Sequence, residues 1–257
     1  LTPDSFHADS RVPSLEEAVR RASNMVRDGA EWIDIGGEST RPGAAPVNHS
    51  EEVRRVVPVI EAVRSAIPDV CISIDTRKAS VALAALKAGA DMVNDVSALS
   101  DQRMVDVVSQ SGCPVCIMHM QGLPRNMQDN PWYGDVVAEV RGVLNGAARR
   151  LFDAGVAPER VIADPGIGFG KGLEHNLALL AAGRGVVPHP QMPLMWGVSR
   201  KTMFHHLLDR EDTRERLAGT LGVAAKSVAL GVDVIRVHDV AEHADMFAAM
   251  SALEVSE

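Results

Sequence analysis

The sequence lacks any long uninterrupted apolar segment and any run rich in Lys or Arg. A membrane-spanning helix needs about 18 or more apolar residues, and a secretory leader needs a basic region followed by an apolar one; neither pattern is present. The formal net charge of −8 argues against polyanionic partners, which are held by neutralising their phosphates. We therefore expect a cytoplasmic protein that binds neither membranes nor nucleic acid.

Cysteine is also scarce, with Cys71, Cys113 and Cys116 as the three examples. An odd number in apolar segments of a chain this large argues against a disulfide framework. Cys113 and Cys116 have the spacing of a redox or zinc pair, but the second pair that a zinc site needs is absent, which favours a structural role.

The composition instead supplies ample material for a packed core. Hydrophobic residues make up 46% and charged residues 23% of the 257 residues. Disorder is not expected, and the length suits one α/β barrel. We predict a single domain over residues 1–257.

Short β-branched segments alternate with longer segments of helical period along the whole chain, which is typical of βα units and a parallel sheet. The expected strands are Glu31–Gly36, Asp69–Asp75, Ala90–Asp95, Pro114–His119, Arg160–Asp164, Met192–Ser199 and Val232–His238. A helix is expected from the N-cap Ser14 to about Gly29, and another around residues 53–63, weakened locally by Pro58.

Two architectures share this alternation, a closed barrel and an open doubly wound sheet. Each expected strand ends in a polar or Gly-rich cluster, whereas an open sheet concentrates its site on a few strands, so the pattern favours the barrel. The first helix precedes the first visible strand. A (β/α)₈ TIM barrel would therefore need one more strand, which we expect before Leu1.

The strand ends divide into an acidic and amide-rich half and a basic half. Asp34, Asp75, Asn94 and Asp164 follow early and middle strands, whereas Ser199-Arg-Lys201 and Arg236-Val-His238 follow late ones. Carboxylates accept hydrogen bonds from N–H-rich heterocycles, and guanidinium and ammonium groups suit phosphate oxygens. A substrate with a nitrogen heterocycle at one end and a phosphate at the other would satisfy both halves.

Five blocks in order resemble the dihydropteroate synthase family of pterin-binding enzymes. They are Leu1-Thr-Pro-Asp-Ser-Phe6, Gly36-Gly-Glu-Ser-Thr-Arg-Pro-Gly43, Asp164-Pro-Gly-Ile-Gly-Phe-Gly-Lys171, Ser199-Arg-Lys201 and Arg236-Val-His-Asp-Val240. The resemblance extends over nearly the whole chain. It implies a (β/α)₈ barrel that condenses 6-hydroxymethyl-7,8-dihydropterin pyrophosphate with p-aminobenzoate to give 7,8-dihydropteroate and pyrophosphate.

The resemblance also implies roles for individual residues. The pterin ring would contact Asp75, Asn94, Met118, Asp164, Phe169 and Lys201, with Asp34 in a possible supporting role. Pyrophosphate would bind Arg236 and His238, and these two with Asp75 and Lys201 would form the catalytic set. The p-aminobenzoate pocket and its loops would use Phe6, Thr40, Arg41, Pro42, Phe169 and Ser199.

In this family the pyrophosphate leaves before the arylamine attacks, so no protein nucleophile is expected. The resemblance implies Mg²⁺ as a cofactor, whose Asn ligand is expected before Leu1 rather than within the sequence. It further implies a homodimer and competitive inhibition by sulfonamides. The run His7-Ala-Asp-Ser10 is less glycine-rich than is usual in the first loop of the family, which would stiffen it.

Other interpretations remain open at this point. A methyltetrahydrofolate-dependent methyltransferase has a similar barrel and pterin pocket, but it does not handle pyrophosphate. A non-catalytic homologue that binds pterin would keep the same fold. Gly166, Gly168 and Gly170 before Lys171 fit neither the dinucleotide nor the Walker pattern and are better read as a turn after a strand. His119 by default is a satisfied core histidine.

Overall fold

The fold is a parallel β-structure surrounded by helices, seen in a computed structural model that describes residues 15–40 and 43–253. All seven expected strands are present, within the predicted ranges but shorter. They are β1 Trp32–Gly36, β2 Cys71–Asp75, β3 Met92–Asp95, β4 Val115–Met118, β5 Val161–Asp164, β6 Met195–Trp196 and β7 Val234–Ile235.

The strands follow one another in space in the order of the sequence. Strands β1 to β5 form one parallel sheet, β6 pairs in parallel with β7, and a bridge between Ala163 and Leu194 joins the two groups. An open doubly wound sheet would reverse its strand order at a switch point, and no reversal occurs in the described chain. The order therefore agrees with the predicted barrel, although no backbone pairing joins β7 to β1 among the described residues.

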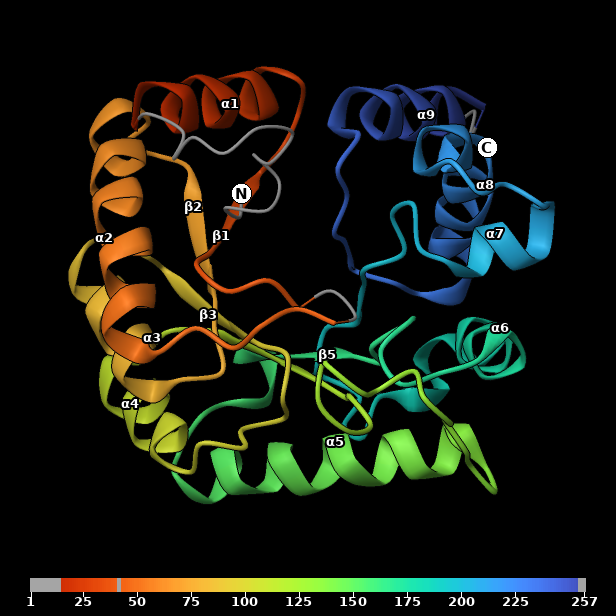
Figure 1. Cartoon of the computed structure of the whole chain (residues 1–257), viewed down its shortest axis with the longest axis horizontal. Helices are drawn as coiled ribbons and strands as arrows, with labels where there is room; N and C mark the ends of the chain where they lie inside the picture. Colours follow the sequence, from red (N-terminus) through yellow and green to blue (C-terminus); the bar gives the residue numbers. More distant parts are fainter. Residues whose placement is uncertain (1–14, 41–42, 254–257) are drawn as a thin grey trace.

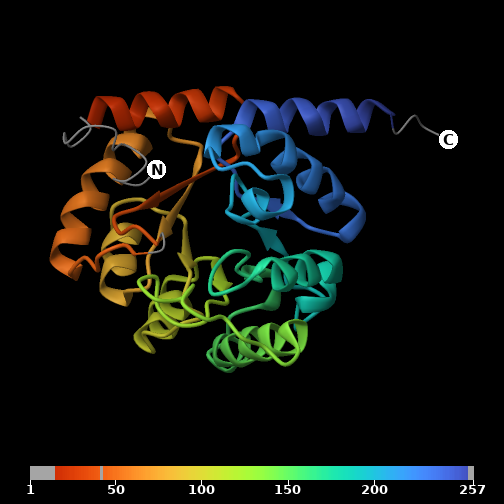
Figure 2. The same ribbon diagram turned by 45° about the vertical axis from the view of Figure 1, so that its right-hand side comes forward.

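Helices form the outer layer (Figures 1 and 2). They are α1 Leu15–Arg27, α2 His49–Ala66, α3 Ala79–Lys87, α4 Arg103–Ser111, α5 Val136–Asp153, α6 Leu173–Ala182, α7 Met203–Leu208, α8 Leu217–Ser227 and α9 Val240–Leu253. Figure 2 shows α1 and α9 approaching each other on one side of the molecule, where Gly29 lies against Ala244. The outer layer thus brings the end of the first described helix against the start of the last one.

Local sequence explains where several helices begin and end. Asn48 precedes α2 and its side chain accepts a hydrogen bond from the backbone N–H of Glu51 at 2.9 Å, as an N-cap should. Gly112 ends α4 in the left-handed conformation that glycine adopts readily. Pro58 lies inside α2, and the helix continues through it for its full 18 residues.

The alternation of side chains along each strand separates two cores. Outward residues such as Ile72, Ile74 and Ile117 are fully buried against the helices. Inward residues form a separate apolar floor from Met92, Cys116, Ile162 and Met195, with Cys71 and Val234 packed against it. Two residues further along four of these strands the inward side chain is polar, namely Ser73, Asn94, Asp164 and Arg236. The floor therefore supports a polar layer at the carboxyl ends of the strands.

Two features of the whole chain bear on the sequence predictions. Cys113 packs in the outer core and Cys116 in the floor, and neither is in a disulfide, so the pair does not act as a unit. None of the described helices combines the length and the apolar character required to cross a membrane.

Candidate active site

The acidic half of the site lies at the ends of β1, β2 and β3. Asp75 and Asn94 are paired in register on β2 and β3, and Asn94 Nδ2 donates to Asp34 Oδ2 at 3.3 Å. The Arg236 guanidinium, from just after β7, lies 2.7 Å from Asp34 Oδ2 and 3.5 Å from Asp75 Oδ2. One cation from the C-terminal part of the chain thus bridges two carboxylates from the first two strands.

The three charges of this group strongly influence one another. Burial, and then the neighbouring Asp34 carboxylate, raises the pKa of Asp75 to about 7. Burial, the largest single influence, opposes ionisation of Asp34, but the attraction of Arg236 and the hydrogen bonds from Ser73 and Arg236 act with other charges to leave the pKa of Asp34 below its ordinary value. Near neutral pH Asp34 is therefore ionised opposite the positive charge of Arg236, and Asp75 can donate or accept a proton.

The next group forms around the loop after β5. Asp164 is 5% exposed, its Oδ1 accepts from the backbone N–H of Gly166 at 2.7 Å, and burial raises its pKa. Lys201 Nζ donates to the Ile167 carbonyl at 2.6 Å and lies 4.0 Å from the centre of the Phe169 ring. Burial lowers the pKa of Lys201 to about 8, so the amine exchanges its proton close to neutral pH.

The basic half combines the segments after β6 and β7. His238 Nδ1 lies 2.8 Å from the Ser199 hydroxyl, which also accepts from the His238 backbone N–H at 3.2 Å. Burial, and then the neighbouring Arg236, lowers the pKa of His238 to about 4, so the ring is neutral at pH 7. Arg200 Nε donates to Asp239 Oδ2 at 2.7 Å, which ties the two segments together.

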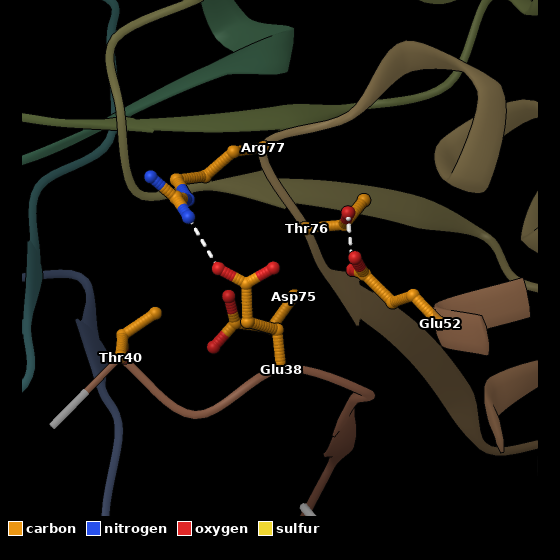
Figure 3. Close-up of a pocket in the computed structure, with 6 residues that line it drawn as sticks. All are labelled: Glu38, Thr40, Glu52, Asp75, Thr76 and Arg77. Atoms are coloured by element: carbon orange, nitrogen blue, oxygen red, sulfur yellow. Dashed lines mark hydrogen bonds and ion pairs between the residues drawn. The ribbon is translucent and has the colours of Figure 1, made fainter. Parts of the chain in front are cut away.

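A polar cluster beside Asp75 anchors the loop that follows β1. Figure 3 shows the side chains that line this small pocket: Glu38, Thr40, Glu52, Asp75, Thr76 and Arg77. Glu38 pairs with Arg77 and Lys78, and the fully buried Glu52 accepts from Lys78 and, at 2.6 Å, from the Thr76 hydroxyl. Thr40, two residues after the ion-paired Glu38, lines this pocket together with Asp75.

The structure gathers the predicted residues into neighbouring contact groups. Asp34, Asp75, Asn94 and Arg236 form one group, Asp164, Phe169 and Lys201 surround one loop, and Ser199 contacts His238. Met118 is paired in register with Asp164 and lies against Gly166. Phe6, Arg41 and Pro42 lie outside the described residues.

Several buried polar residues of the site have no local sequence signal. The Glu38 cluster joins residues about 40 positions apart, and the buried Lys171 contacts His119 across 52 positions. A charged residue at 7% exposure or less, such as Glu38, Glu52 or Lys171, is a reliable sign of a specific partner, but only once burial is known. His119 is 5% exposed and bonded to Lys171, which agrees with its interpretation as a satisfied core histidine.

Within the described segments, no three His, Cys, Asp or Glu side chains are arranged to hold a metal ion. Asp34 and Asp75 are the nearest candidates, but Arg236 already faces both carboxylates. The described residues therefore do not by themselves fit the Mg²⁺ that the resemblance implies.

Comparison with known proteins places this arrangement in a family. The pattern of pterin binding enzymes matches residues 1–238, and the chain belongs to this family. Its relatives within the family include the dihydropteroate synthase of Escherichia coli K12, 45% identical over 242 residues that cover 94% of this chain and 85% of the relative. The dihydropteroate synthase of Synechocystis is 42% identical over 98% of this chain and 87% of its own.

Solved structures agree with the sequence comparison. The Yersinia pestis dihydropteroate synthase, determined with a sulfonamide drug complex, matches with a TM-score of 0.91 and 40% identity over 99% of this chain and 92% of its own. The Burkholderia cenocepacia enzyme, complexed with 7,8-dihydropteroate, matches with a TM-score of 0.87 and 44% identity over 94% of this chain and 88% of its own. The barrel fold expected from the sequence is thus shared with these enzymes.

Proposed function

We propose that this chain is a dihydropteroate synthase, which condenses 6-hydroxymethyl-7,8-dihydropterin pyrophosphate with p-aminobenzoate to give 7,8-dihydropteroate and pyrophosphate. The observation that carries the proposal is the bridge from Arg236 to Asp34 and Asp75, which places an anion-binding group beside buried carboxylates in one site. The relatives that match nearly the whole chain carry the same name.

The acidic half suits the pterin ring. Asp75, Asn94 and Asp164 are each 7% exposed or less, so their hydrogen bonds to ring N–H and carbonyl groups would form away from water. Met118, 3% exposed, offers an apolar surface at the same level. We assign these four side chains to the pterin, with Asp34 supporting them through Asn94 and Arg236.

The basic half suits the leaving group. Arg236 supplies a permanent positive charge, and the neutral His238 ring and the Ser199 hydroxyl can adjust their hydrogen bonds to pyrophosphate oxygens. When the bond from the pterin methylene carbon to oxygen breaks, both electrons leave with the pyrophosphate. Arg236 lies where that negative charge grows, which is the usual electrostatic contribution to such a step.

The remaining residues suit the second substrate. Lys201 and Phe169 face each other at 4.0 Å, and we assign them to the junction between the pterin and p-aminobenzoate, with Thr40 at the rim. The arylamine nitrogen attacks the electron-poor methylene carbon, forms the C–N bond and loses a proton to solvent. Asp75 and Asp164 stabilise the positive charge on the pterin before the attack, and no covalent bond to the protein forms.

Mg²⁺ remains a prediction and takes no part in these assignments, because the described residues offer no ligand set for it. If the ion enters with the pyrophosphate, turnover falls in EDTA and returns with added Mg²⁺. Binding of the pterin ring alone, without pyrophosphate, stays unchanged in the same titration.

Other expectations belong to the same proposal. Homodimer formation has support from Leu207, Leu208 and Val228, which are 42 to 52% exposed on and near α7 and α8; sedimentation analysis tests it. Competitive inhibition by sulfonamides has support from the Yersinia pestis complex. A single domain over residues 1–257 and a cytoplasmic location also remain proposals.

The decisive experiment measures product. The chain is incubated with Mg²⁺, dihydropterin pyrophosphate and p-aminobenzoate, and dihydropteroate and pyrophosphate are followed together. Lys201→Ala and Arg236→Ala should abolish turnover, whereas the exposed controls Lys87→Ala and Arg141→Ala should retain it. A folded chain that binds the pterin but forms no product would instead support a non-catalytic homologue.

A further inference from the structure

Lys171 is a buried amine that the proposed reaction does not use. Its side chain is 3% exposed. Its Nζ lies 2.9 Å from the carbonyl oxygens of Gly166 and Phe169, 2.9 Å from His119 Nδ1 and 3.3 Å from the His119 carbonyl. All four neighbours are uncharged, and three of them are backbone carbonyl oxygens. The Lys171 amine therefore binds the backbone of the loop and forms no direct ion pair. Burying an amine costs free energy unless its hydrogen bonds are made, which argues for a specific role.

The loop that Lys171 holds has an unusual pattern of hydrogen bonds. The carbonyl oxygens of five successive residues, 166–170, each accept from a side chain. The donors in order are Lys171 to Gly166 (2.9 Å), Lys201 to Ile167 (2.6 Å), Gln128 to Gly168 (2.6 Å), Lys171 to Phe169 (2.9 Å) and the Tyr133 hydroxyl to Gly170 (2.7 Å). Lys171 is the donor that joins the two ends of the central turn.

The backbone of this loop is so tightly packed that its shape affects the positions of neighbouring side chains. Gly166 and Gly168 both have positive φ angles, and a Cβ on Gly166 would lie 1.9 Å from the His119 carbonyl. A Cβ on Gly168 would lie 2.9 Å from Cδ of Lys201, so main chain and Lys201 are in direct contact. A small shift of the turn would therefore move the Ile167 carbonyl that Lys201 contacts and the ring of Phe169.

We propose that Lys171 is a positioning residue, whose amine fixes the 166–169 turn and thereby places Lys201 and Phe169 for the second substrate. The inference rests on the proposed function, because Lys201 and Phe169 are assigned there to the junction of the two substrates. It adds a residue that touches neither substrate but determines where two residues that do touch them lie.

The test replaces Lys171 with Met, which keeps the length and apolar stem of the side chain and removes its donors. A misplacement of about 1 Å at a reacting centre can cost about 100-fold in rate, so we expect kcat to fall by roughly 10- to 100-fold. The KM for p-aminobenzoate should rise by more than the Kd for the pterin pyrophosphate, because Asp75 and Asn94, which also hold the pterin, lie outside the turn and are unaltered. Equal changes in both substrates' binding, or wild-type kinetics, would overturn the inference.

A matched control separates positioning from general destabilisation. Ile60 is fully buried on α2, a helix with no hydrogen bond to the 166–171 turn, so Ile60→Ala should lower stability without changing kcat per pterin-binding site. Amide exchange should accelerate at residues 166–170 in Lys171→Met and not in Ile60→Ala. If Lys171→Met does not fold, Lys171→Gln takes its place, because it retains one donor group on a shorter side chain. It should show the same difference between p-aminobenzoate and pterin binding, with a smaller loss of kcat.

The outcomes also distinguish the inference from the proposed function. If the unaltered chain forms no dihydropteroate, the proposed function fails. The role of Lys171 in fixing the 166–169 turn is then tested by amide exchange alone. Unchanged exchange at residues 166–170 in the Lys171 variants would then overturn the positioning role. Product formation by the unaltered chain with unchanged kinetics in both variants would overturn only the role of Lys171.

Discussion

Replacing Asp75 with Asn should stabilise the folded protein above neutral pH while it removes pterin binding. Asp75 is 7% exposed and its pKa is raised from the ordinary 3.8 to about 7, first by burial and then by Asp34. Holding this carboxylate ionised in the folded state therefore costs roughly 4 kcal/mol. Because buried sites relax and admit water around a charge, we expect about half of this, near 2 kcal/mol, to return in the variant.

The pH dependence of this gain has a definite sign. A carboxyl whose folded pKa is raised binds more protons in the folded state than in the unfolded state between about pH 4 and pH 7. The wild-type protein therefore loses stability relative to Asp75→Asn as the pH rises through this window. The difference should be near zero below pH 4 and level off above pH 7.

Urea unfolding from pH 4 to pH 9 measures the difference, with the exposed Asp153→Asn as a control that should show none. Titration of a pterin ligand on the same samples should show binding lost only in Asp75→Asn. A stability difference that does not vary with pH, or a variant less stable than wild type at pH 8, would refute the electrostatic reasoning.

Three further substitutions have defined outcomes. Arg236→Met should lower the free energy of unfolding by roughly 2 kcal/mol, less than for a fully buried pair because the arginine is partly exposed, as urea unfolding would show. Gly166→Ala should prevent soluble expression or shift the β5 loop, since its Cβ would meet the His119 carbonyl at 1.9 Å; a normal melting temperature would contradict this. Glu38→Gln should cost about 1–3 kcal/mol at pH 7 by removing the carboxylate that pairs with both Arg77 and Lys78, of which Lys78 keeps Glu52. Contacts with its basic partners outweigh burial and lower the pKa of Glu38, so this cost should disappear as the pH falls below 4.5, measured by thermal unfolding.

The sequence predicted the strands and the residues at their ends because both have local signals. β-branched segments alternate with helical periods, and Asp34, Asp75, Asn94 and Asp164 each stand where such a segment stops. The carboxyl ends of parallel strands meet at one face, so residues far apart in sequence can be assigned to one site. The 202 positions between Asp34 and Arg236 are bridged by this rule alone.

These local rules could not predict the lengths of the strands or the contacts between buried polar side chains. Strand β6 was expected over Met192–Ser199 but covers two residues, because Pro193 has no N–H to donate and Arg200 turns the chain with a φ of +55°. Strand β7 is equally short, yet the Arg236 N–H still reaches the Trp196 carbonyl at 2.9 Å. The contacts of Lys171 and Glu38 depend on three-dimensional proximity that no local pattern encodes.

The sulphur-rich composition of the floor makes it a natural spectroscopic reporter. Four of its six residues, Met92, Cys116, Met195 and Cys71, contain sulphur, and they lie beneath the polar layer. The chain has 11 methionines, so ¹³C-methyl labelling gives few NMR signals, and Met92→Leu and Met195→Leu would assign the two from the floor. These methyl groups sense ring currents and packing, so they would register occupancy of the site above without any label on the ligand.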